Sequence, residues 1–301
     1  MAMRVKTALM LLLTSFLLSM ALIKYANAAS PLNYPENCCL SFDGADDYVH
    51  CNSLDSYNTS KFTIELWMRP KYPLQDGSDP AYRHECGSLV SCSDGWTVEL
   101  DYKSGDLLVG INDGTSMKGV RGGTYGGREA WNTSWYHIAV VYDPELLDLN
   151  LKVYVNGTVD WYGPSLGNTT YTSMGMKIGR YLSFVNDTFG GLVDEVRYWN
   201  ACRSSVEISD SYSRVLNYSE LNDQELVGYW RFDEGVGSSS QDYSMQHNNA
   251  FLAASPSDPS WVDYGAPIVP EFPSFLTLPL FIAATVVAVI IYRRKRSFSL
   301  M

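Results

Sequence analysis

The stretch GLVDEVRYWN, residues 191–200, decides the fold because it has the pattern of a largely buried strand. Asp194, Glu195 and Arg197 are its charged residues, and most of the others are apolar or aromatic. Paired carboxylates can form the acid and base of a glycosidase, but successive strand residues point to opposite faces. Asp194 and Glu195 are therefore predicted to point apart, whereas Glu195 and Arg197 share a face and can form an ion pair. This pattern predicts a structural strand and argues against an enzyme.

Strand patterns continue on both sides of this stretch. FTIELWMR, residues 62–69, alternates in hydrophobicity, and WYHIAVVYD, residues 135–143, is apolar on both faces, as in a central strand. LNLKVYVNGTVDWY, residues 149–162, is an amphipathic hairpin that turns at Asn156-Gly157, and TVELDYKSGDLLVGIND, residues 97–113, is a second hairpin. Many short strands with polar turns predict an all-β, two-sheet antiparallel sandwich.

One segment, from Ser204 to about Val215, has a helical pattern instead. Ser204 or Ser205 can cap its N-terminus, and Glu207 lies near the first turn, where an acidic side chain is favourable. We therefore expect one short helix on a framework that otherwise consists of strands.

Seven segments carry a family resemblance. They are LSFDGADDYVHC (40–51), FTIELWMRP (62–70), SWYHIAVVYD (134–143), LKVYVNG (151–157), KIGR (177–180), FGGLVDEVRYWNACRS (189–204) and LVGYWRFDEGVGSSSQDYSMQHNNAFL (226–252). Together they resemble a laminin-G-like domain of the concanavalin A-like lectin/glucanase superfamily. The resemblance implies a jelly roll of two antiparallel sheets, one of them concave, over residues 30–268. The last segment usually opens such a domain and closes it here, which requires both domain ends to lie on neighbouring strands.

Residues 1–28 have the pattern of a signal peptide. Arg4 and Lys6 precede an apolar run from Ala8 to Leu22, and Ala26-Asn27-Ala28 is a small-x-small cleavage signal. We therefore expect the protein to be exported, with the mature chain beginning near Ala29.

Residues 269–292 are predicted to tether the protein to a membrane. The run 272–292 carries no charge and is long enough to cross a hydrocarbon core about 30 Å thick. The basic tail 293–301 is expected on the cytoplasmic side, so the domain would lie on the extracellular face of the cell membrane. Pro270-Glu271-Phe272, with this span and tail, resembles the PEF-type sorting signal of archaeal surface proteins. That resemblance implies an archaeal source and an enzyme that can replace the helix by a lipid anchor.

The predicted domain is strongly acidic. Without the seven basic residues of the two chain ends and without Glu271, it keeps 15 basic and 32 acidic residues, a net charge of −17. Such a surface repels nucleic acid and other polyanions, so we expect no nucleic-acid partner. Neutral ligands and divalent cations are compatible with it.

Cysteines and glycosylation signals also fit an exported domain. Six cysteines form an even set, which favours disulfides outside the cell, and the short spacing of Cys86 and Cys92 makes them the predicted pair. Glycans are expected at the N-x-[ST] signals of Asn58, Asn132, Asn168, Asn186 and Asn217. A sixth signal, at Asn156, is weaker because its amide lies in a hairpin turn and can face inward.

Catalytic motifs are incomplete. Laminarinase relatives of this fold place E-x-D-x-x-E on one strand, and this resemblance puts Glu99 and Asp101 at its first two acidic positions. Ser104 stands where the second Glu is needed. A retaining glycosidase needs two carboxylates about 5 Å apart, one of them protonated. We therefore predict that the protein is not an enzyme.

Aromatic residues in predicted loops are the candidate ligand-binding residues. Trp161 and Tyr162 precede a Gly-Pro turn, and Trp131 lies in the polar segment REAWNTSW. Aromatic rings can stack on the apolar faces of sugars. We therefore expect a non-catalytic domain that binds an extracellular glycan or a surface glycoprotein. A structural envelope module that binds proteins is the alternative, and a polysaccharide hydrolase or lyase is the second alternative.

A structural calcium site is implied by the resemblance. Relatives often hold calcium with an Asp in the strand equivalent to 192–199, together with carbonyl groups near the start of the domain. On this basis Asp194, Asp43 and Gly44 are the candidate ligands, because calcium accepts carboxylate and carbonyl oxygens. The alternative is that Asp194 accepts hydrogen bonds from backbone amides without a metal.

Overall fold

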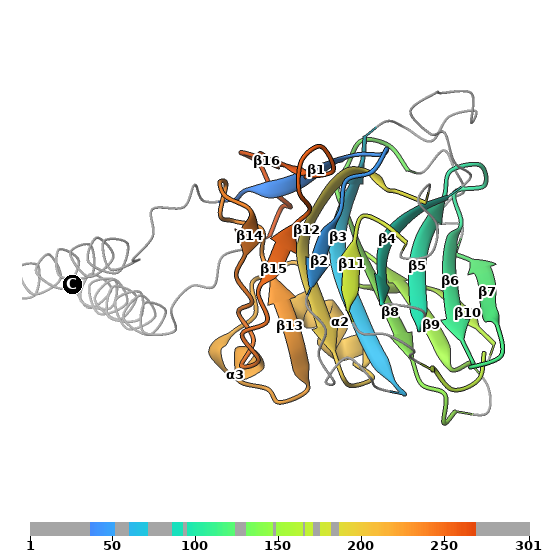
Figure 1. Cartoon of the computed structure of the whole chain (residues 1–301). Coiled ribbons are helices and arrows are strands. Elements are labelled where there is room, and N and C mark those ends of the chain that lie inside the picture. Colours follow the sequence, from blue (N-terminus) through green and yellow to red (C-terminus); the bar gives the residue numbers. More distant parts are fainter. Residues whose placement is uncertain are drawn as a thin grey trace, which may run out of the picture. The chain divides into compact units, whose positions relative to one another are not determined.

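Two antiparallel sheets make up the fold. The computed structural model describes residues 37–51, 60–71, 86–92, 95–123, 131–146, 149–164, 166–170, 175–181 and 187–268. Sheet A has the order β10 (Thr158–Gly163), β9 (Leu151–Val155), β8 (Tyr136–Tyr142), β3 (Phe62–Pro70), β12 (Gly190–Trp199), β1 (Cys39–Asp43) and β16 (Ser260–Val262), and β13 (Leu226–Trp230) also pairs with β12. Sheet B has the order β14 (Ser239–Ser240), β15 (Ala250–Leu252), β2 (Val49–Cys51), β11 (Met176–Ile178), β4 (Cys86–Cys92), β5 (Trp96–Asp101), β6 (Leu107–Asn112) and β7 (Met117–Gly122). The sheets lie face to face, with β14 and β15 at one end of sheet B and β7 at the other (Figure 1).

The core lies between the sheets and confirms the predicted all-β sandwich. Alternate residues of strands in both sheets, such as Ile64 of β3 and Val98 of β5, join one buried cluster. Phe62 of sheet A stacks on Trp96 of sheet B, with ring centroids 4.8 Å apart. Burial of each such side chain contributes about 1.5–3 kcal/mol, so alternation along the strands is the main driving force for this architecture.

The two ends of the described domain lie on neighbouring strands, as the order of its segments requires. Near the start, β1 pairs with β16, and β2 pairs with β15, both in antiparallel register. The C-terminal segment therefore completes both sheets beside the first strands of the chain.

The hairpin between β9 and β10 forms at the predicted turn. Asn156 and Gly157 have φ values of 50° and 75°, the left-handed conformation that a two-residue hairpin turn requires. Oδ1 of Asn156 accepts a hydrogen bond from the backbone N–H of His137 at 2.9 Å. The Asn156 amide is thus turned toward the neighbouring strand, as the sequence indicated.

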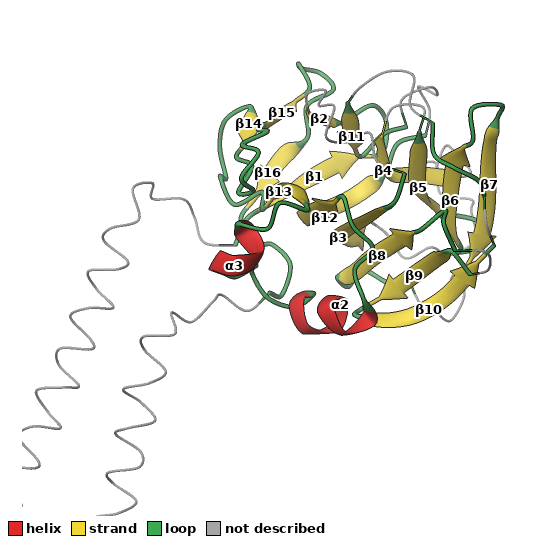
Figure 2. Ribbon diagram, turned by 90° about the horizontal axis from the view of Figure 1, so that it is seen from below, coloured by secondary structure: helices red, strands yellow, loops and turns green. Residues whose placement is uncertain are grey.

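Two short helices cover the side of sheet A that faces away from sheet B (Figure 2). The predicted helix is α2 (Ser205–Ser211), with Ser204 as its N-cap and Glu207 completing a capping box. Ile208 of α2 packs against Ala139, Val141 and Tyr154 of sheet A. A second helix, α3 (Tyr218–Leu221), was not predicted because its single turn is too short to show a periodicity.

The predicted disulfide between Cys86 and Cys92 is wrong. These residues are the two ends of strand β4, six positions apart in an extended chain. That spacing separates their Cα atoms by about 20 Å, whereas a disulfide needs about 7 Å or less. Cys92 is an unbridged, buried thiol, and so are Cys39 and Cys51. The short spacing predicts a loop between the two cysteines, but the chain forms a strand there.

The chain ends fall outside this description. The predicted signal peptide, residues 1–28, and the predicted anchor and tail, residues 269–301, lie outside the described residues. Within the described part of the chain, no helix is both long and apolar enough to span a bilayer.

A β-bulge in β12 changes the predicted arrangement of the acids. Asp194 pairs with Trp67 of β3, and Arg197 pairs with Glu65, so three steps on β12 match two on β3. Glu195 is the extra residue and has φ 52°. Residues opposite one another on paired strands share a face, so Asp194 and Arg197 lie on the same outer side of sheet A. The prediction that Asp194 and Glu195 point to opposite faces is therefore wrong, because alternation is interrupted between them.

The bulge places Glu195 in a buried network of charges. Its Oε2 accepts hydrogen bonds from Nη2 of Arg197 at 3.1 Å and from the hydroxyl of Tyr229. Its Oε1 lies 3.4 Å from Nε of Arg231. This confirms the predicted ion pair of Glu195 with Arg197. Arg197 also donates to the carbonyl oxygen of Ser211, so the network joins β12 to the end of α2.

We expect Glu195→Gln to lower the free energy of unfolding by about 3–5 kcal/mol, because it leaves the Arg197 guanidinium buried without its counter-charge. Urea unfolding followed by tryptophan fluorescence measures the change. Glu225→Gln, at an exposed position, is the matched control and should leave stability unchanged. A loss below 1 kcal/mol for Glu195→Gln would show that the network is dispensable.

Candidate functional site

A row of side chains crosses the outer face of sheet B. Core residues such as Val49 and Cys51 of β2 point inward, so the residues between them point outward. The register of the strands sets these outward residues opposite one another across the sheet. In spatial order the row is Ser239, Phe251, His50, Lys177, Ser91 and Thr97. It begins at the β14 end of the sheet and brings together residues that are far apart in sequence.

Part of this row forms an aromatic–cation cluster, which consists of Tyr48, His50, Lys177, Arg180 and Phe251. The rings of His50 and Phe251 stack with centroids 5.7 Å apart. Nζ of Lys177 lies 4.5 Å from the ring centroid of Tyr48, and Cζ of Arg180 lies 5.3 Å from it. Phe251 is 37% exposed and the other four are partly exposed, so the cluster is accessible. It offers ring faces and two positive charges on one surface.

A polar pocket of about 360 Å³ lies at the β14 end of the same sheet. The described residues that line it come from the segments before, within and after β14. They are Glu234, Ser239, Gln241, Asp242, His247 and Asn249. Ser239 also stands opposite Phe251, so the pocket borders the aromatic–cation cluster.

Glu234 and Asp242 are both buried acids of this pocket, and Glu234 is the one with an oxygen that no described residue satisfies. It is 6% exposed, and its Oε1 accepts hydrogen bonds from the hydroxyl of Ser240 and the backbone N–H of Gln241. Its Oε2 has no hydrogen-bond donor among the described residues. Burial raises the pKa of this carboxyl group. An acceptor without a donor is costly in a buried position, so Oε2 is suited to receive a ligand hydroxyl.

Asp242 fixes the shape of the pocket. Its carboxylate accepts hydrogen bonds from the backbone N–H groups of Tyr229, Ser244 and Asn248 and from the hydroxyl of Ser244. Its own N–H donates to Oδ1 of Asn249 at 3.1 Å. Because these bonds occupy Asp242, its role is to hold the two loop segments around the pocket rather than to bind a ligand.

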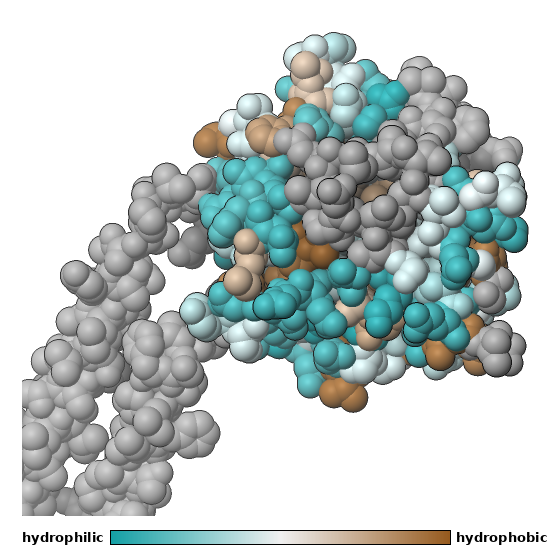
Figure 3. Space-filling model, turned by 60° about the horizontal axis from the view of Figure 1, so that its bottom comes forward, coloured by the Kyte–Doolittle hydropathy of each residue, from teal (hydrophilic) through white to brown (hydrophobic). Residues whose placement is uncertain are grey.

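The face of the molecule shown in Figure 3 is largely hydrophilic in its described part, and its hydrophobic side chains are scattered. Exposed apolar side chains that occur singly are common on soluble proteins and indicate no broad apolar interface.

Two of the three predicted ligand-binding aromatics are structural. Trp131 is fully buried, its indole N–H donates to the carbonyl oxygen of Gly105, and its ring packs edge-on against Tyr136. The polar residues around Trp131 predict a surface loop, but its large ring is buried in the core. Trp161 is partly buried against the core and covers Gly122 of β7, where a Cβ would lie 2.1 Å from the ring.

Tyr162 is the exposed member of the predicted set, with 48% of its surface accessible. It lies on β10, the edge of sheet A, and β10 contacts β7 at the end of the sandwich opposite β14. The structure thus does not bring Trp131, Trp161 and Tyr162 into one site. Sequence reasoning missed the aromatic–cation cluster, because its members come from separate strands and loops.

The predicted glycosylation sites divide into three groups. Asn132 and Asn168 are exposed. Asn217 is partly buried, and its Oδ1 caps α3 by accepting from the N–H groups of Ser219 and Glu220. Asn58 and Asn186 lie outside the described residues. Glycosylation itself stays a prediction.

The predicted calcium ligands do not lie together. Asp43 pairs with Gly190 at one end of β12, so Asp194 is four residues further along that strand, about 13 Å away. The Gly44 carbonyl accepts a hydrogen bond from the hydroxyl of buried Thr188. A joint site of Asp194, Asp43 and Gly44 is therefore wrong, because the register sets Asp43 and Asp194 at different positions along β12.

Asp194 has other oxygen atoms beside it. Its Oδ1 accepts from the N–H of Glu195, and its Oδ2 accepts from the N–H of Ala266. Three oxygen atoms surround the point that a Cβ on Gly265 would occupy, each within 2.8 Å of it. They are Oδ2 of Asp194, the carbonyl oxygen of Cys38 and Oδ1 of Asn37. Burial, with Glu195 and Asp233 nearby, holds the Asp194 pKa well above its usual range.

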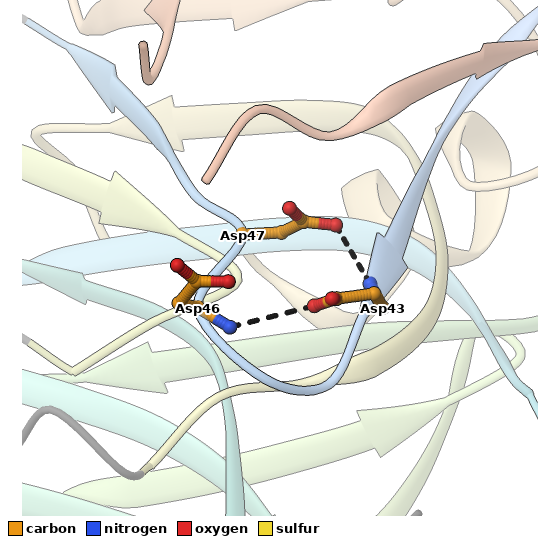
Figure 4. A group of neighbouring side chains, drawn as sticks. All are labelled: Asp43, Asp46 and Asp47. Carbon is orange, nitrogen blue, oxygen red and sulfur yellow. Dashed lines mark hydrogen bonds between the residues drawn. The ribbon is translucent and has the colours of Figure 1, made fainter. Parts of the chain in front are cut away.

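Asp43 instead belongs to an acidic cluster with Asp46 and Asp47 (Figure 4). Oδ2 of Asp47 accepts from the N–H of Asp43, and Oδ1 of Asp43 accepts from the N–H of Ala45. Burial and the two neighbouring carboxylates raise the pKa of Asp47 to about 6. Through these hydrogen bonds, Asp43 and Asp47 stabilise the turn between β1 and β2.

Glu99 and Asp101 share the outer side of sheet B, as strand alternation predicts, but both are buried. Oε1 of Glu99 accepts from the hydroxyl of Thr97 at 3.0 Å, and burial raises the Glu99 pKa to about 7. Asp101 forms an ion pair with Arg121 and accepts from the N–H groups of Lys103 and Ser104. Asp101 is therefore committed to the turn after β5, where the hydroxyl oxygen of Ser104 accepts a hydrogen bond from the N–H of Asp106.

The two sheets and their antiparallel register define a concanavalin A-like sandwich. A laminin-G family model with the description "Concanavalin A-like lectin/glucanases superfamily" matches residues 43–209, so the chain belongs to this superfamily. Among curated proteins, none matches the sequence.

Several solved structures are similar to this chain. A Bacteroides ovatus protein that has been assigned as carbohydrate-binding has 18% identity and a TM-score of 0.58, covering 78% of this chain and 62% of its own. The match thus spans less than two thirds of that protein. A heptameric SAP-like pentraxin from Limulus polyphemus has 17% identity and a TM-score of 0.44, covering 58% of this chain and 81% of its own. Domains LG4-5 of the mouse laminin alpha1 chain have 10% identity and a TM-score of 0.41, covering 58% and 44%. At these identities the similarity is one of fold.

We expect Glu99→Gln to stabilise the protein increasingly as the pH rises from about 4.5 to about 7. Over this range the unfolded chain loses the Glu99 proton while the folded protein, with a pKa of about 7, keeps it. The free energy of unfolding of the parent protein therefore falls with pH, and the Gln variant lacks this loss. Urea unfolding of both proteins at four pH values measures the difference. Parallel curves across the range would contradict the raised pKa.

Proposed function

We propose that this protein is a non-catalytic domain that binds carbohydrate, as a free extracellular glycan or as part of a surface glycoprotein. The observation that carries the proposal is the polar pocket, in which no residue that the structure describes donates a hydrogen bond to the buried Oε2 of Glu234. The aromatic–cation cluster borders this pocket on the same face of the sheet.

The pocket has the hydrogen-bonding groups that a sugar requires. Sugar hydroxyls both donate and accept, and a carboxylate accepts while amide side chains do both. Glu234 supplies the acceptor, and Gln241 and Asn249 line the pocket with amide groups. A ligand hydroxyl that donates to Oε2 of Glu234 would satisfy this buried oxygen and so add to binding free energy.

The neighbouring rings supply the apolar half of the site. Phe251 is exposed beside the pocket and is supported by the stacked ring of His50. Aromatic faces of this kind bind the apolar faces of sugar rings. The superfamily is named for lectins as well as glucanases, and the Bacteroides ovatus relative has been assigned as carbohydrate-binding. Both support binding to a glycan as the function of this face.

Two observations support binding without catalysis. Asp194 and Glu195 are both buried and their carboxylate oxygens accept hydrogen bonds from protein groups, so neither is accessible to a polysaccharide substrate. Asp101 is tied to Arg121 and to the turn after β5, so Glu99 has no free partner carboxylate there. A glycoside hydrolase of the usual two-carboxylate type would need such a partner.

The proposed location is the extracellular face of the cell membrane. Its support is the sequence of the two ends: the signal-peptide pattern of residues 1–28, the apolar run 272–292 and the cations from Arg293 to Arg296. The PEF motif at 270–272 supports exchange of the helix for a lipid anchor in an archaeal cell. The net charge of −17 between residues 30 and 268 supports a partner other than nucleic acid.

We also propose that a calcium ion braces the start and end of the domain at Asp194. The donor set beside Gly265 consists of oxygen atoms alone, from Asp194, Asn37 and Cys38, which suits calcium. Burial, and then the charges of Glu195 and Asp233, raise the pKa of Asp194, and a bound cation would favour the charged form of this carboxyl group. Bound calcium would link β12 to the first and last described segments and would supply no catalytic chemistry.

We expect Glu234→Gln to weaken glycan binding about tenfold or more, because it replaces a charged acceptor with a weaker one in a pocket of the same shape. A glycan array identifies ligands of the parent protein, and isothermal titration calorimetry compares the variants. Glu145→Gln, at an exposed position, is the matched control and should bind like the parent. Binding to envelope proteins without any glycan hit would instead support the scaffold alternative.

Calcium should raise the melting temperature of the parent protein, and a chelator should lower it. Asp194→Asn removes the charged ligand and should abolish the response to calcium. Differential scanning calorimetry with calcium or EDTA measures both effects. Asp43→Asn is the control, because Asp43 lies about 13 Å from Asp194 and should keep the response. An unchanged melting temperature with EDTA would leave Asp194 bound only to backbone amides.

A further inference from the structure

Two cations on the outer face of sheet B form no ion pair with an acid in the part of the chain that the structure describes. Lys177 and Arg180 both lie against the ring of Tyr48. Among the described residues no Asp or Glu forms an ion pair with either, and Nε of Arg180 is buried without a hydrogen-bond acceptor. Six other described cations form ion pairs with acids, and Arg69 and Lys152 are further described cations without one. The six are Lys118, Arg121, Arg197, Arg203, Arg214 and Arg231.

Lys177 and Arg180 are two like charges that lie against the same ring, so they repel one another. Burial, and then the charge of Arg180, lower the pKa of Lys177. The domain has 32 acidic residues for 15 basic ones, so acidic partners are abundant elsewhere on it. Like charges held together in a strongly acidic protein are typical of a site that receives an anion.

We infer that the aromatic–cation cluster binds the carboxylate of an acidic sugar, so that the ligand is a glycan with a uronic acid next to neutral sugars. This inference rests on the proposed function and specifies its ligand. The guanidinium of Arg180 can hold a carboxylate through two parallel hydrogen bonds, and Lys177 adds a second charge beside it. Tyr48, His50 and Phe251 supply ring faces for the sugar.

The row across the sheet gives this ligand an orientation. From Lys177 on β11 through His50 and Phe251 to Ser239 on β14 there are three strand spacings, about 14 Å. That length exceeds one sugar ring, so an oligosaccharide can contact the cations and the pocket together. The Glu234 carboxylate at the far end favours neutral hydroxyls and repels further acid groups. A sparsely charged glycan therefore fits this row better than a densely sulfated one.

The test compares uronic-acid oligosaccharides from glucuronoxylan, in which neutral sugars flank the acidic one, with their carboxyl-reduced forms. We expect at least one acidic form to bind tenfold or more tightly than its reduced form. Lys177→Gln and Arg180→Gln should each remove most of this preference, and Arg180→Lys should remove part of it because it keeps the charge but loses the planar fork. Lys152→Gln, on strand β9 of the other sheet, removes the same charge and should keep the preference. Melting curves confirm that the variants are folded.

The outcomes separate the two proposals. Equal binding of acidic and reduced oligosaccharides, unaffected by the variants at 177 and 180, would overturn the uronic-acid assignment and leave carbohydrate binding in place. Dextran sulfate that binds as tightly as the uronic-acid oligosaccharides, or more tightly, would show that the cluster attracts anions in general. This result would also overturn the assignment. Failure of every acidic and neutral glycan to bind would overturn the proposed function together with this inference.

Discussion

The buried network around Glu195 is the constraint on which the rest of the structure depends. It forms because Glu195 takes a left-handed conformation and interrupts the alternation of β12. The same strand pairs with β3, β1 and β13, so this one position connects the middle of sheet A to its later segments. Arg197 carries the network on to the carbonyl oxygens at the end of α2. Without these partners, two or more charges would be buried without compensation, which is far more costly than any single apolar contact.

Much of the fold can be predicted from short sequence patterns, because hairpin turns and helix caps depend on the residues of the turn or cap itself. Asn156-Gly157 forms its hairpin since both residues tolerate positive φ, and Ser204 with Glu207 caps α2 since their side chains reach the free N–H groups. The bulge at Glu195 is different, because the residue itself disfavours that conformation and tertiary partners impose it. The Cys86–Cys92 prediction failed for a related reason, since spacing along the chain does not reveal whether the chain turns or extends between two residues.

The candidate site could be predicted less well than the fold. Trp131 and Trp161 lie near polar residues in the sequence, which predicts exposed rings. In the structure the ring of Trp131 fills the core and that of Trp161 covers a glycine. The residues that do share an exposed face are assembled by strand register. Lys177 and Phe251 are neighbours of His50 only because β11 and β15 pair with β2 on either side. No short motif encodes such a row, so it becomes visible once the pairing of the strands is known.

The row also explains how one sheet face can combine opposite charges. Glu234 at the β14 end and the Lys177–Arg180 pair toward the middle of the sheet are separated by the rings of Phe251 and His50, so they do not neutralise one another. Glu234 and the Lys177–Arg180 pair therefore remain without the charge compensation that an ion pair between them would provide. A ligand that places hydroxyls at one end and a carboxylate about 14 Å away would satisfy both, and stability alone offers no reason to keep them apart.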